Sequence, residues 1–532
     1  LKGHKSNTVE ASLPPAMIGL LLGSLVLPAA AYDNGAPHSR MPPLGWSSWV
    51  ALGKGWDTEQ AKAPEFDFCD EVSVKASIDA FHSVGLYDAG YRHFHLDDCW
   101  ADRQRNASGF LQAERDHFPN GMKPIVEYAH SKGLTFGLYT CAGTYTCVGK
   151  RPGSKGHFTQ DANVFAEWGV DVVKMDWCNT QGMEPKDTYA EFSQALNATG
   201  RPIHFNMCEW GKEAPWEWAP RIAQSWRATG DHTGTWESTK SIIAARTKIP
   251  KELSGVSYAW NDLDMLETGN YKQAAHANGK LGRMTETEYK TEFSMWAILA
   301  SPLVVTTPIV NCSSTDQIGG NYTPSSCKPS ITDLQKEILF NKEILAINQD
   351  VTPAGSRLLP VVEPPSAALS QACNITTKVS VSACVENDSF GCAGDGTMWV
   401  AKGCRGVFSC GGVANVHCPL KEEGPRPVDS MSRNITCKCA PPPPVGIQVY
   451  ARELTGGDMA VALYNEDEAA EEGSFEFKLL GWPSGTKAAV RDLWAHKDLG
   501  IFQDSLPKTT VEAHGAKVLR LSRQPASTAV YV

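Results

Sequence analysis

The chain has 532 residues, of which 42% are hydrophobic and 20% are charged, and its formal net charge at pH 7 is −10. This length and apolar content predict a globular protein of two or three domains. The negative charge and the absence of Lys/Arg runs argue against nucleic acid as a partner, because phosphate backbones are bound by clustered basic side chains.

Residues 1–31 have the pattern of a secretory signal peptide. A weakly basic start is followed by an apolar stretch over about 13–27 and by three alanines that end at Ala31,. A membrane anchor is the alternative, but the stretch is short and prolines interrupt it. We therefore expect cleavage after Ala31, no membrane association afterwards, and a place in the secretory pathway, extracellular or vacuolar/lysosomal.

The 16 cysteines fit this compartment. In an oxidising environment they are better explained by disulfides than by metal binding, and no two Cys-x-x-Cys pairs have zinc-site spacing. Several Asn-x-Ser/Thr sequons indicate a glycoprotein. We expect neither a metal nor a cofactor.

Residues 32–350 are predicted to form an α/β domain, a (β/α)₈ TIM barrel. Short apolar runs alternate with amphipathic segments, and two of the helix-like segments, 73–90 and 124–133, end in glycine,. A doubly wound open sheet is the alternative, but no Gly-rich phosphate loop follows the first strand. The expected strands are 44–49, 91–97, 134–139, 170–176, 202–208, 223–229, 256–260 and 302–307.

Charged residues end several of these strands, where a barrel carries its functional groups. In "VDVVKMD", Lys174 and Asp176 share one face, and we expect the lysine to lower the pKa of Asp176 and keep it ionised as a nucleophile,. In "QSWRATGD", Asp231 follows Arg227 by four residues and is the candidate acid. The alternatives are a helix cap or ion pair for Asp176 and a turn-stabilising role for Asp231. Two such carboxylates are the minimum for glycoside hydrolysis.

The C-terminal part divides by composition. Residues 351–372 are a linker or the first strand of a β-domain, and residues 373–439 hold half of all cysteines and indicate a disulfide-rich module,. Residues 440–532 are predicted to form an antiparallel β-sandwich. Its expected strands are 447–454, 458–467, 473–480, 488–494 and 516–522.

Eight motifs in chain order resemble glycoside hydrolase family 27, which contains α-galactosidases and α-N-acetylgalactosaminidases. They are "MPPLGWSSW", "HLDDCW", "GLTFGLYTCAG", "WGVDVVKMDWC", "CEWG", "SWRATGD", "WNDLDML" and "MWAILASPLVV". The resemblance covers about 41–350 and, more loosely, the C-terminal β-domain. It implies a retaining mechanism without a cofactor, in which Asp176 is the nucleophile and Asp231 the acid/base.

The resemblance also implies a galactose site and two disulfides, Cys69–Cys99 and Cys147–Cys178. The substrate-binding residues would be Trp46, Asp97, Asp98, Tyr139, Lys174, Cys208, Glu209, Trp210, Arg227 and Met265. The aromatic members could instead belong to the core. Carboxylates are good acceptors for sugar hydroxyls.

The expected function is therefore a retaining α-galactosidase that acts on terminal α-galactosyl residues. Glu209 stands where an N-acetylgalactosaminidase tends to have a small residue, and the intact "LDDCW" speaks against a β-L-arabinopyranosidase. The alternatives are an α-N-acetylgalactosaminidase or an inactive galactose-binding barrel. The expected partners are α-galactosides; a homodimer and a glycan contact of segment 373–439 are further hypotheses.

Four departures from the family pattern stand near the expected site, one of them Leu263 where proline is usual. Trp177 follows the nucleophile where a small residue is common and could narrow the acceptor side. Ser47 replaces a usual asparagine, and Cys141 is an extra cysteine whose partner the sequence does not reveal.

Overall fold

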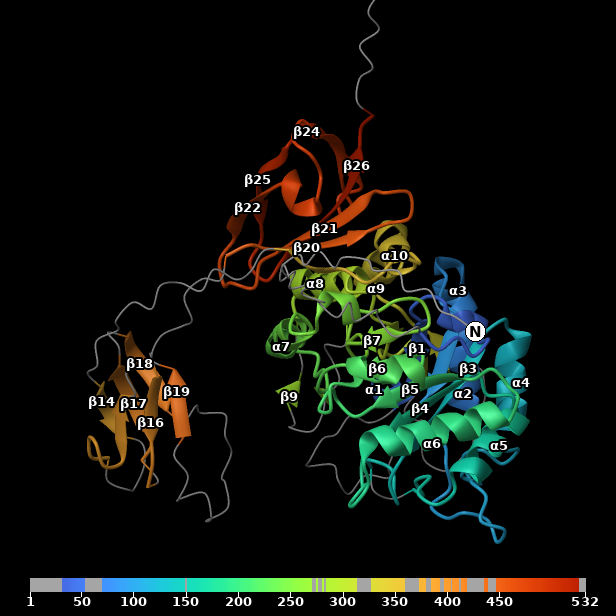
Figure 1. Cartoon of the computed structure of the whole chain (residues 1–532). Helices are drawn as coiled ribbons and strands as arrows, with labels where there is room; N and C mark the ends of the chain where they lie inside the picture. Colours follow the sequence, from blue (N-terminus) through green and yellow to red (C-terminus); the bar gives the residue numbers. More distant parts are fainter. Residues whose placement is uncertain are drawn as a thin grey trace, which may run out of the picture.

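The structure, a computed structural model, describes most of the chain (Figure 1). The expected signal peptide, apart from Ala31, and much of segment 351–372 lie outside the described residues. The described ranges are 31–52, 69–148, 151–269, 274–275, 280–281, 284–312, 327–358, 373–378, 384–392, 397–402, 404–410, 413–418, 435–438 and 446–525.

Eight parallel strands form the barrel, in the order β10-β1-β2-β3-β4-β5-β6-β7. The circle closes where Leu266, just after β7, bridges Val305 of β10 in parallel, and its backbone N–H donates to the Val304 carbonyl at 2.8 Å. The predicted TIM barrel is thereby confirmed. The strands are β1 Leu44–Ser47, β2 His93–Leu96, β3 Thr135–Cys141, β4 Val172–Asp176, β5 His204–Cys208, β6 Ser225–Arg227, β7 Trp260–Asp262 and β10 Leu303–Val305.

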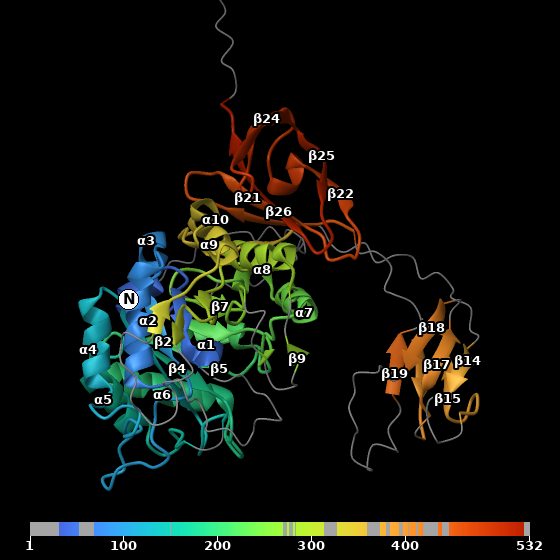
Figure 2. The same cartoon turned by 180° about the vertical axis from the view of Figure 1, so that it is seen from behind.

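Helices surround the strands (Figures 1 and 2). The expected helix 73–90 is divided at Gly85, whose φ of +95° ends one helix and begins the next,. The α-helices are α1 Ser48–Ala51, α2 Glu71–Ser83, α3 Leu86–Ala89, α4 Lys123–Ser131, α5 Phe158–Trp168, α6 Pro185–Ala198, α7 Trp236–Arg246, α8 Glu286–Ile298, α9 Asp333–Leu339 and α10 Lys342–Asn348. Short 3₁₀ turns are η1 Pro37–Ser39, η3 Pro215–Glu217, η4 Ala219–Arg221 and η5 Lys251–Leu253.

The seventh strand was expected at 256–260, and this boundary is wrong. The backbone of Val256 and Ala259 pairs in a tight turn, and Tyr258 has φ +67°, a conformation that a strand residue does not adopt,. The strand begins only at Trp260. The β-branched and aromatic letters of "VSYAW" are equally compatible with this turn.

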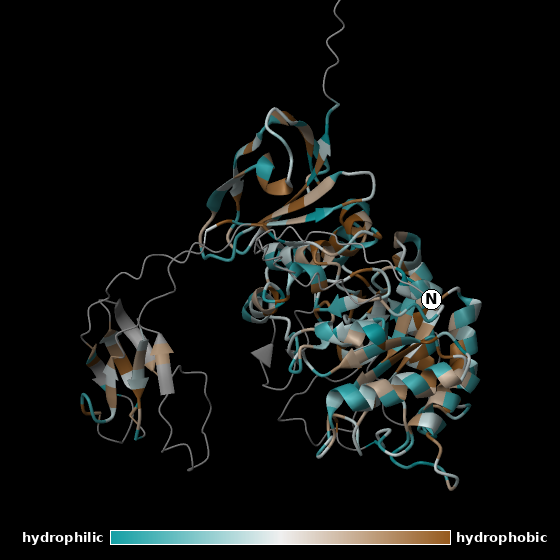
Figure 3. Cartoon of the chain, in the orientation of Figure 1, coloured by the Kyte–Doolittle hydropathy of each residue, from teal (hydrophilic) through white to brown (hydrophobic). Residues whose placement is uncertain are grey.

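The apolar core lies between strands and helices, where Phe94 and Leu96 of β2 point outward. The alternate residues His93 and His95 point inward and line a cavity along the barrel axis,. Figure 3 shows the hydrophobic residues concentrated on the barrel strands, with hydrophilic residues on the outer helix faces. None of the helices among the described residues has the length and apolar character needed to span a bilayer.

An antiparallel β-sandwich follows the barrel, as predicted. A six-stranded sheet, β13-β20-β21-β26-β23-β24, faces the pair β22-β25. Two of its strands, β24 and β25, were not expected. The strands are β13 Ser356–Arg357, β20 Gln448–Glu453, β21 Met459–Tyr464, β22 Glu471–Glu476, β23 Lys487–Asp492, β24 Lys497–Gln503, β25 Ser505–Val511 and β26 Ala516–Arg523, with a 3₁₀ turn η9 at Phe477–Leu480.

The Cys-rich segment forms two three-stranded sheets, β14-β17-β18 and β15-β16-β19, drawn apart from the other domains in Figure 1. The disulfides Cys373–Cys392 and Cys418–Cys437 connect the two sheets, and Cys384–Cys404 links adjoining segments. The strands are β14 Cys373–Lys378, β15 Phe390–Cys392, β16 Thr397–Val400, β17 Gly406–Cys410, β18 Val413–Cys418 and β19 Ile435–Lys438. Two short two-stranded sheets complete the set: β8 Ala274–Ala275 with β9 Lys280–Leu281, and β11 Val310–Cys312 with β12 Cys327–Pro329.

Candidate active site

Asp176 is the last residue of β4 and lies at the carboxyl end of the barrel, only 8% exposed. Its Oδ2 accepts a hydrogen bond from the Tyr139 hydroxyl at 3.0 Å, and its Oδ1 accepts one from the Trp177 backbone N–H at 2.9 Å. The parallel register of β3 and β4 sets Tyr139 beside Lys174, one pleat below Asp176. Both carboxylate oxygens are therefore fixed by neighbouring strand ends.

Lys174 lowers the pKa of Asp176 as expected, but the pKa is raised overall, which the sequence did not predict. Burial raises the pKa more than Lys174 and the Trp177 N–H lower it, and Asp231 and Asp97 add negative charge,. Lys174 is also engaged elsewhere, because its Nζ lies 2.9 Å from Asp97 Oδ2. The sequence could show the lysine but not how completely the carboxylate leaves water.

Asp231 follows β6 and its side chain is 56% exposed, in contrast to the buried Asp176. Its Oδ1 lies 3.0 Å from Arg227 Nη2. The guanidinium is itself buried and also contacts Asp264 Oδ2 at 2.9 Å. The negative charge of Asp231 raises the pKa of Asp176, so one buried and one open carboxylate influence each other at this end of the barrel.

Asp264 belongs to this site although it was not among the predicted site residues. Its backbone has φ +82°, and its carboxylate accepts hydrogen bonds from the backbone N–H groups of His232 and Met265. Burial alone would raise its pKa, but Arg227 and the His232 N–H lower it overall,. The sequence pattern that could have identified Asp264 as a site residue is the pair of aspartates at alternate positions, Asp262 and Asp264, after "YAWN".

Asp97 and Asp98 follow β2 and are both buried. Asp97 Oδ1 accepts from the Asp98 backbone N–H at 2.9 Å, while Asp98 Oδ2 accepts from the Val148 N–H at 3.2 Å. Within the described part of the chain, Asp98 Oδ1 has no hydrogen-bond partner. Burial raises the pKa of Asp98 to about 7. The pair thus presents one oxygen without a protein donor.

Glu209 follows β5 and, like Asp98, has one buried carboxylate oxygen without a hydrogen-bond donor among the described residues. Its Oε2 accepts from the Glu213 backbone N–H at 2.8 Å, whereas its Oε1 is buried without a partner among the described residues. Burial raises its pKa to about 7. The preceding Cys208 is a buried free thiol 3.7 Å from Arg227 Nη1. Trp210 is half-buried with φ +60°, and the Lys212 ammonium lies over its ring.

Trp46 lies deeper than the other predicted members. It is 0% exposed, packs on Phe94, and donates its indole N–H to the Thr307 carbonyl at 2.7 Å. Met265 lines the central cavity together with Asp97, Lys174 and Arg227. The structure therefore gathers the predicted residues at one end of the barrel, with Trp46 enclosed in its wall.

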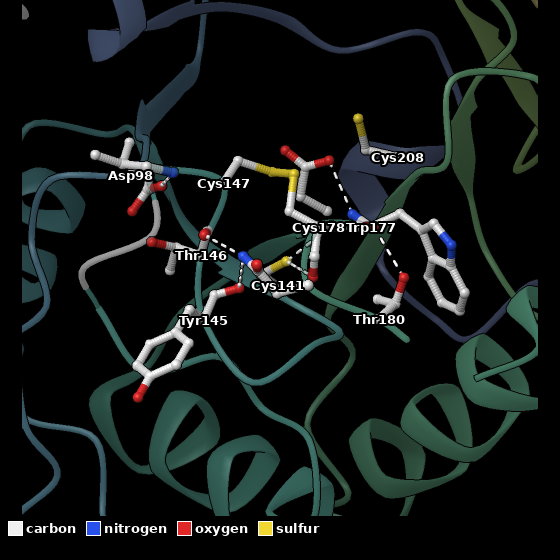
Figure 4. The surroundings of a disulfide bond; sticks show 12 residues. Asp98, Cys141, Tyr145, Thr146, Cys147, Trp177, Cys178, Thr180 and Cys208 are labelled. Carbon is white, nitrogen blue, oxygen red and sulfur yellow. Dashed lines mark hydrogen bonds between the residues drawn. A yellow bond between two sulfur atoms is a disulfide. The ribbon is translucent and has the colours of Figure 1, made fainter. Parts of the chain in front are cut away.

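The structure contains both disulfides that the family resemblance implies, Cys69–Cys99 and Cys147–Cys178. Figure 4 shows the second one, which ties the loop after β3 to the residues following Asp176. Cys141 is a buried free thiol beside it, donating to the Cys178 carbonyl and accepting from the Cys178 N–H, both at 3.2 Å.

Trp177 points away from this loop and packs on Tyr189 of α6, with ring centroids 5.1 Å apart (Figure 4). Its bulk is therefore taken up between β4 and α6. In the described part of the chain, one group has metal-like spacing, Cys147, Asp176 and Cys178, within 4.8 Å. Two of its three ligand atoms are the sulfurs of the disulfide, which offer no thiolate,.

Comparison with known proteins places the chain in a family. A family model described as "Alpha galactosidase A" matches residues 41–318, and one described as "Alpha galactosidase C-terminal beta sandwich domain" matches residues 445–521. The chain is 37% identical to Alpha-galactosidase A of Cellvibrio japonicus over 342 residues, which are 63% of this chain and 73% of that protein. It is 31% identical to Alpha-galactosidase 3 of Arabidopsis thaliana over 491 residues, 92% and 83% of the two chains.

Among solved structures, α-galactosidase I from Mortierella vinacea is similar with a TM-score of 0.63 and 25% identity, covering 93% of this chain and 100% of that one. The eight motifs, the barrel, the sandwich and the relatives agree. This chain belongs to glycoside hydrolase family 27, the α-galactosidase family.

Proposed function

We propose that this protein is a retaining α-galactosidase that removes terminal α-linked galactose from oligosaccharides, glycolipids or polysaccharides. The observation that carries the proposal is the pair of carboxylates at the ends of β4 and β6. Asp176 is buried and fixed by two hydrogen bonds, while Asp231 is open to the solvent and close enough to affect its pKa. This asymmetry suits a nucleophile and a proton-transferring acid.

In the first step the Asp176 carboxylate attacks the anomeric carbon, and the bond to the leaving oxygen breaks as Asp231 gives that oxygen its proton. In the second step Asp231 takes a proton from water, whose oxygen attacks the same carbon and releases Asp176. Two inversions give net retention. Asp176 must be ionised at the start. The positive charge of Lys174 and the hydrogen bond from the Trp177 N–H favour the ionised form, against the effect of burial.

The buried acceptors account for recognition of the sugar. Asp98 Oδ1 and Glu209 Oε1 lack donors within the described part of the chain, and galactose hydroxyls would supply them,. By the family resemblance, Glu209 stands where an N-acetylgalactosaminidase tends to have a small residue, so we expect the galactoside to be preferred over the N-acetylgalactosaminide. The curated relatives carry the name α-galactosidase, which agrees with this preference.

The test compares initial rates on p-nitrophenyl α-galactoside and p-nitrophenyl α-N-acetylgalactosaminide. We expect the wild type to prefer the galactoside, and Asp176→Asn to lose about 10⁴-fold or more in kcat. Asp231→Asn should still release p-nitrophenol in a burst, because this leaving group needs little protonation, and then stall. Asp79→Asn, on the surface of α2, is the matched control.

The anomer released first, followed by NMR, tests retention: α-galactose supports the mechanism and β-galactose contradicts it. Faster cleavage of the acetamido sugar would favour the α-N-acetylgalactosaminidase. If galactose binds but neither substrate is cleaved, the inactive barrel would be the better description.

We also propose that the protein is processed in the secretory pathway. Five disulfides among the described residues support an oxidising compartment,. N-terminal sequencing of protein secreted by expressing cells should find Tyr32 first. Retention of residues 1–31 would contradict this proposal.

The roles of the Cys-rich module and of a homodimer are separate proposals. The two sheets of the Cys-rich module have their own small core and disulfides. Deletion of 373–439 should therefore leave hydrolysis of small substrates unchanged. Weaker retention of the deleted form on galactomannan would support a glycan contact, and equal retention would favour a spacer. Analytical ultracentrifugation would decide between monomer and homodimer.

A further inference from the structure

The interior of the barrel directly beneath the proposed site is polar. The cavity that reaches Asp97 and Lys174 is lined lower down by His93, His95 and His204. His204 has two close partners, the hydroxyls of Ser39 and Ser225 at 2.8 and 2.7 Å. The mechanism proposed above uses none of these histidines.

The rings of His93 and His95 fit a space that glycine leaves open. A Cβ atom at Gly137 of β3 would lie 2.5 Å from His95 Nδ1 and 2.6 Å from His93 Cε1. His95 stands opposite Gly137 in the parallel register of β2 and β3. With no side chain at that position, the His95 imidazole can occupy the interior below the strand ends.

One nitrogen of this ring faces the Asp97–Lys174 pair. His95 Nε2 lies 3.5 Å from Asp97 Oδ2, the same oxygen that contacts Lys174 Nζ at 2.9 Å. Nε2 is buried and makes no hydrogen bond among the described residues, so its contact with Asp97 at 3.5 Å is an electrostatic one. The other oxygen of Asp97 is already taken by the Asp98 N–H. His95 is therefore placed to limit the movement of Oδ2.

We propose that His95 is a positioning residue for galactoside binding: it donates Nε2–H to Asp97 and so holds the Asp97–Lys174 pair in the geometry that receives the sugar hydroxyls. The proposal rests on the proposed function of this site. It assigns the donor to Nε2 because the facing atom is a carboxylate oxygen. A shift of this carboxylate would be passed to Asp98 through its N–H.

The imidazole acts in its neutral form. Among the described residues, Asp97 and His93 on β2 lie against it, Lys174 on β4 shares Asp97 with it, and on β3 it meets Gly137, with Tyr139 next to Lys174. Burial, and then the positive charge of Lys174, lower the pKa of His95 well below its ordinary value,. Neutral His95 can donate without competing with Lys174 as a second cation.

The test uses the two amides as isosteres of the two ring nitrogens. In His95→Gln the side-chain amide reaches the position of Nε2, whereas in His95→Asn it reaches only that of Nδ1. We expect His95→Asn to raise KM for p-nitrophenyl α-galactoside and Ki for galactose about 10-fold, the scale of one hydrogen bond to a charged group. His95→Gln should recover most of this loss, with kcat changed less than KM in both.

His93→Gln and His93→Asn are the matched controls, because His93 is equally buried and touches the same glycine but faces Thr135. They should lower Tm to a similar extent and leave KM within about 2-fold. Equal KM for His95→Gln and His95→Asn, or equal rises in the His93 pair, would overturn the proposal. If His95→Asn does not fold, His95→Leu replaces it in the same comparison with His95→Gln.

Galactose binding by Asp176→Asn, measured by calorimetry, separates the two claims. If this form does not bind galactose, the proposed function of the site fails. If it binds galactose and the additional His95→Asn change leaves the affinity unaltered, only the positioning role fails.

Discussion

At the scale of single residues, the site is dominated by carboxyl groups whose burial outweighs their charged partners. Asp98 and Glu209 each bury one oxygen without a donor in the described part of the chain, and the pKa of each rises to about 7. Such groups are costly in the empty protein unless they are protonated. Without a ligand, these two carboxyl groups therefore bind protons near neutral pH. A bound ligand with many hydroxyl groups would donate hydrogen bonds to them and favour their ionised form.

These two pKa values predict a falling stability with rising pH in the ligand-free enzyme. The folded protein holds protons on Asp98 and Glu209 between about pH 4 and pH 7, where the unfolded chain has released them, so this contribution is present below pH 4 and lost by pH 7,. Each group contributes about 3–4 kcal/mol over that window. Tm measured from pH 4 to 8 should fall less steeply in Asp98→Asn and Glu209→Gln.

Asp79→Asn, an exposed carboxylate of α2, should keep the wild-type slope. A stability that rises over the same window in the wild type, or parallel slopes in all variants, would show that these groups are ionised when empty. Galactose should raise Tm more at pH 7 than at pH 4, because it supplies donors to the carboxylates.

The sequence predicted which charged residues end the strands, but not their ionisation. Lys174 stands two residues before Asp176 in the sequence, which suggested a lowered pKa, yet its ammonium is directed to Asp97. Asp264 and His95 were missed for a related reason. Whether a side chain points into the barrel depends on the strand register, which one sequence does not contain.

At the scale of elements, the alternation of strand residues explains both the successes and the errors. Strands with one face buried against helices, such as β2 and β4, were found because their apolar positions alternate or run together. The strand β24 was missed because nearly all of its residues are exposed, so no pattern marks it,. The expected helix 73–90 was divided by Gly85, a residue that a helix tolerates at its end,.

The close approach of β2 and β3 predicts a strong effect of Gly137→Ala. The added Cβ would meet both His93 and His95 at 2.5–2.6 Å, and the backbone of β3 is fixed by its neighbours on both sides. We expect a loss of about 1–3 kcal/mol in the free energy of unfolding. We also expect a higher KM, because the displaced ring is the one beneath Asp97.

Denaturant unfolding and steady-state kinetics would check this effect. Gly200→Ala serves as the control, because nothing lies within 4 Å of its Cβ position and only its φ of +74° opposes the change. A Gly137→Ala enzyme as stable as the wild type, with unchanged KM, would contradict the steric account.

At the scale of the whole molecule, one buried arginine joins the barrel to the sandwich. Arg452 of β20 donates to the backbone carbonyls of Ile347, Asp350 and Thr352 at 2.6, 2.8 and 2.8 Å. Burial lowers its pKa to about 10, so it remains charged at neutral pH. These carbonyls lie at and just beyond the end of α10, where the barrel ends.

Arg452→Met should therefore destabilise both domains together. It removes the donors of several carbonyls at the junction, and we expect a loss of about 3–5 kcal/mol in the free energy of unfolding. The folded fraction should keep a KM near that of the wild type, because the site is at the other end of the strands. Arg520→Met, whose side chain is 47% exposed beside Asp458, should cost about 1 kcal/mol or less,.

The domain order could be predicted from composition, because the cysteines and prolines of the insert contrast with the segments around it. The attachment of the insert could not be fixed in the same way. Residues 351–372 were equally consistent with a linker or a strand, and only the pairing of Ser356 and Arg357 with β20 shows that a strand of the sandwich comes first.

Because of this pairing, the first strand of the sandwich is synthesised well before its partner strand. After β13, the ribosome must add the 90 residues 358–447 before it reaches β20, the strand with which β13 pairs. At about 5–20 residues per second, the first strand waits roughly 5–18 s, and in the secretory pathway proposed above the Cys-rich segment would meet the oxidising machinery during that time. The disulfides of the insert can therefore form before the sandwich exists, and a mispaired cysteine there would delay closure of the domain that surrounds it.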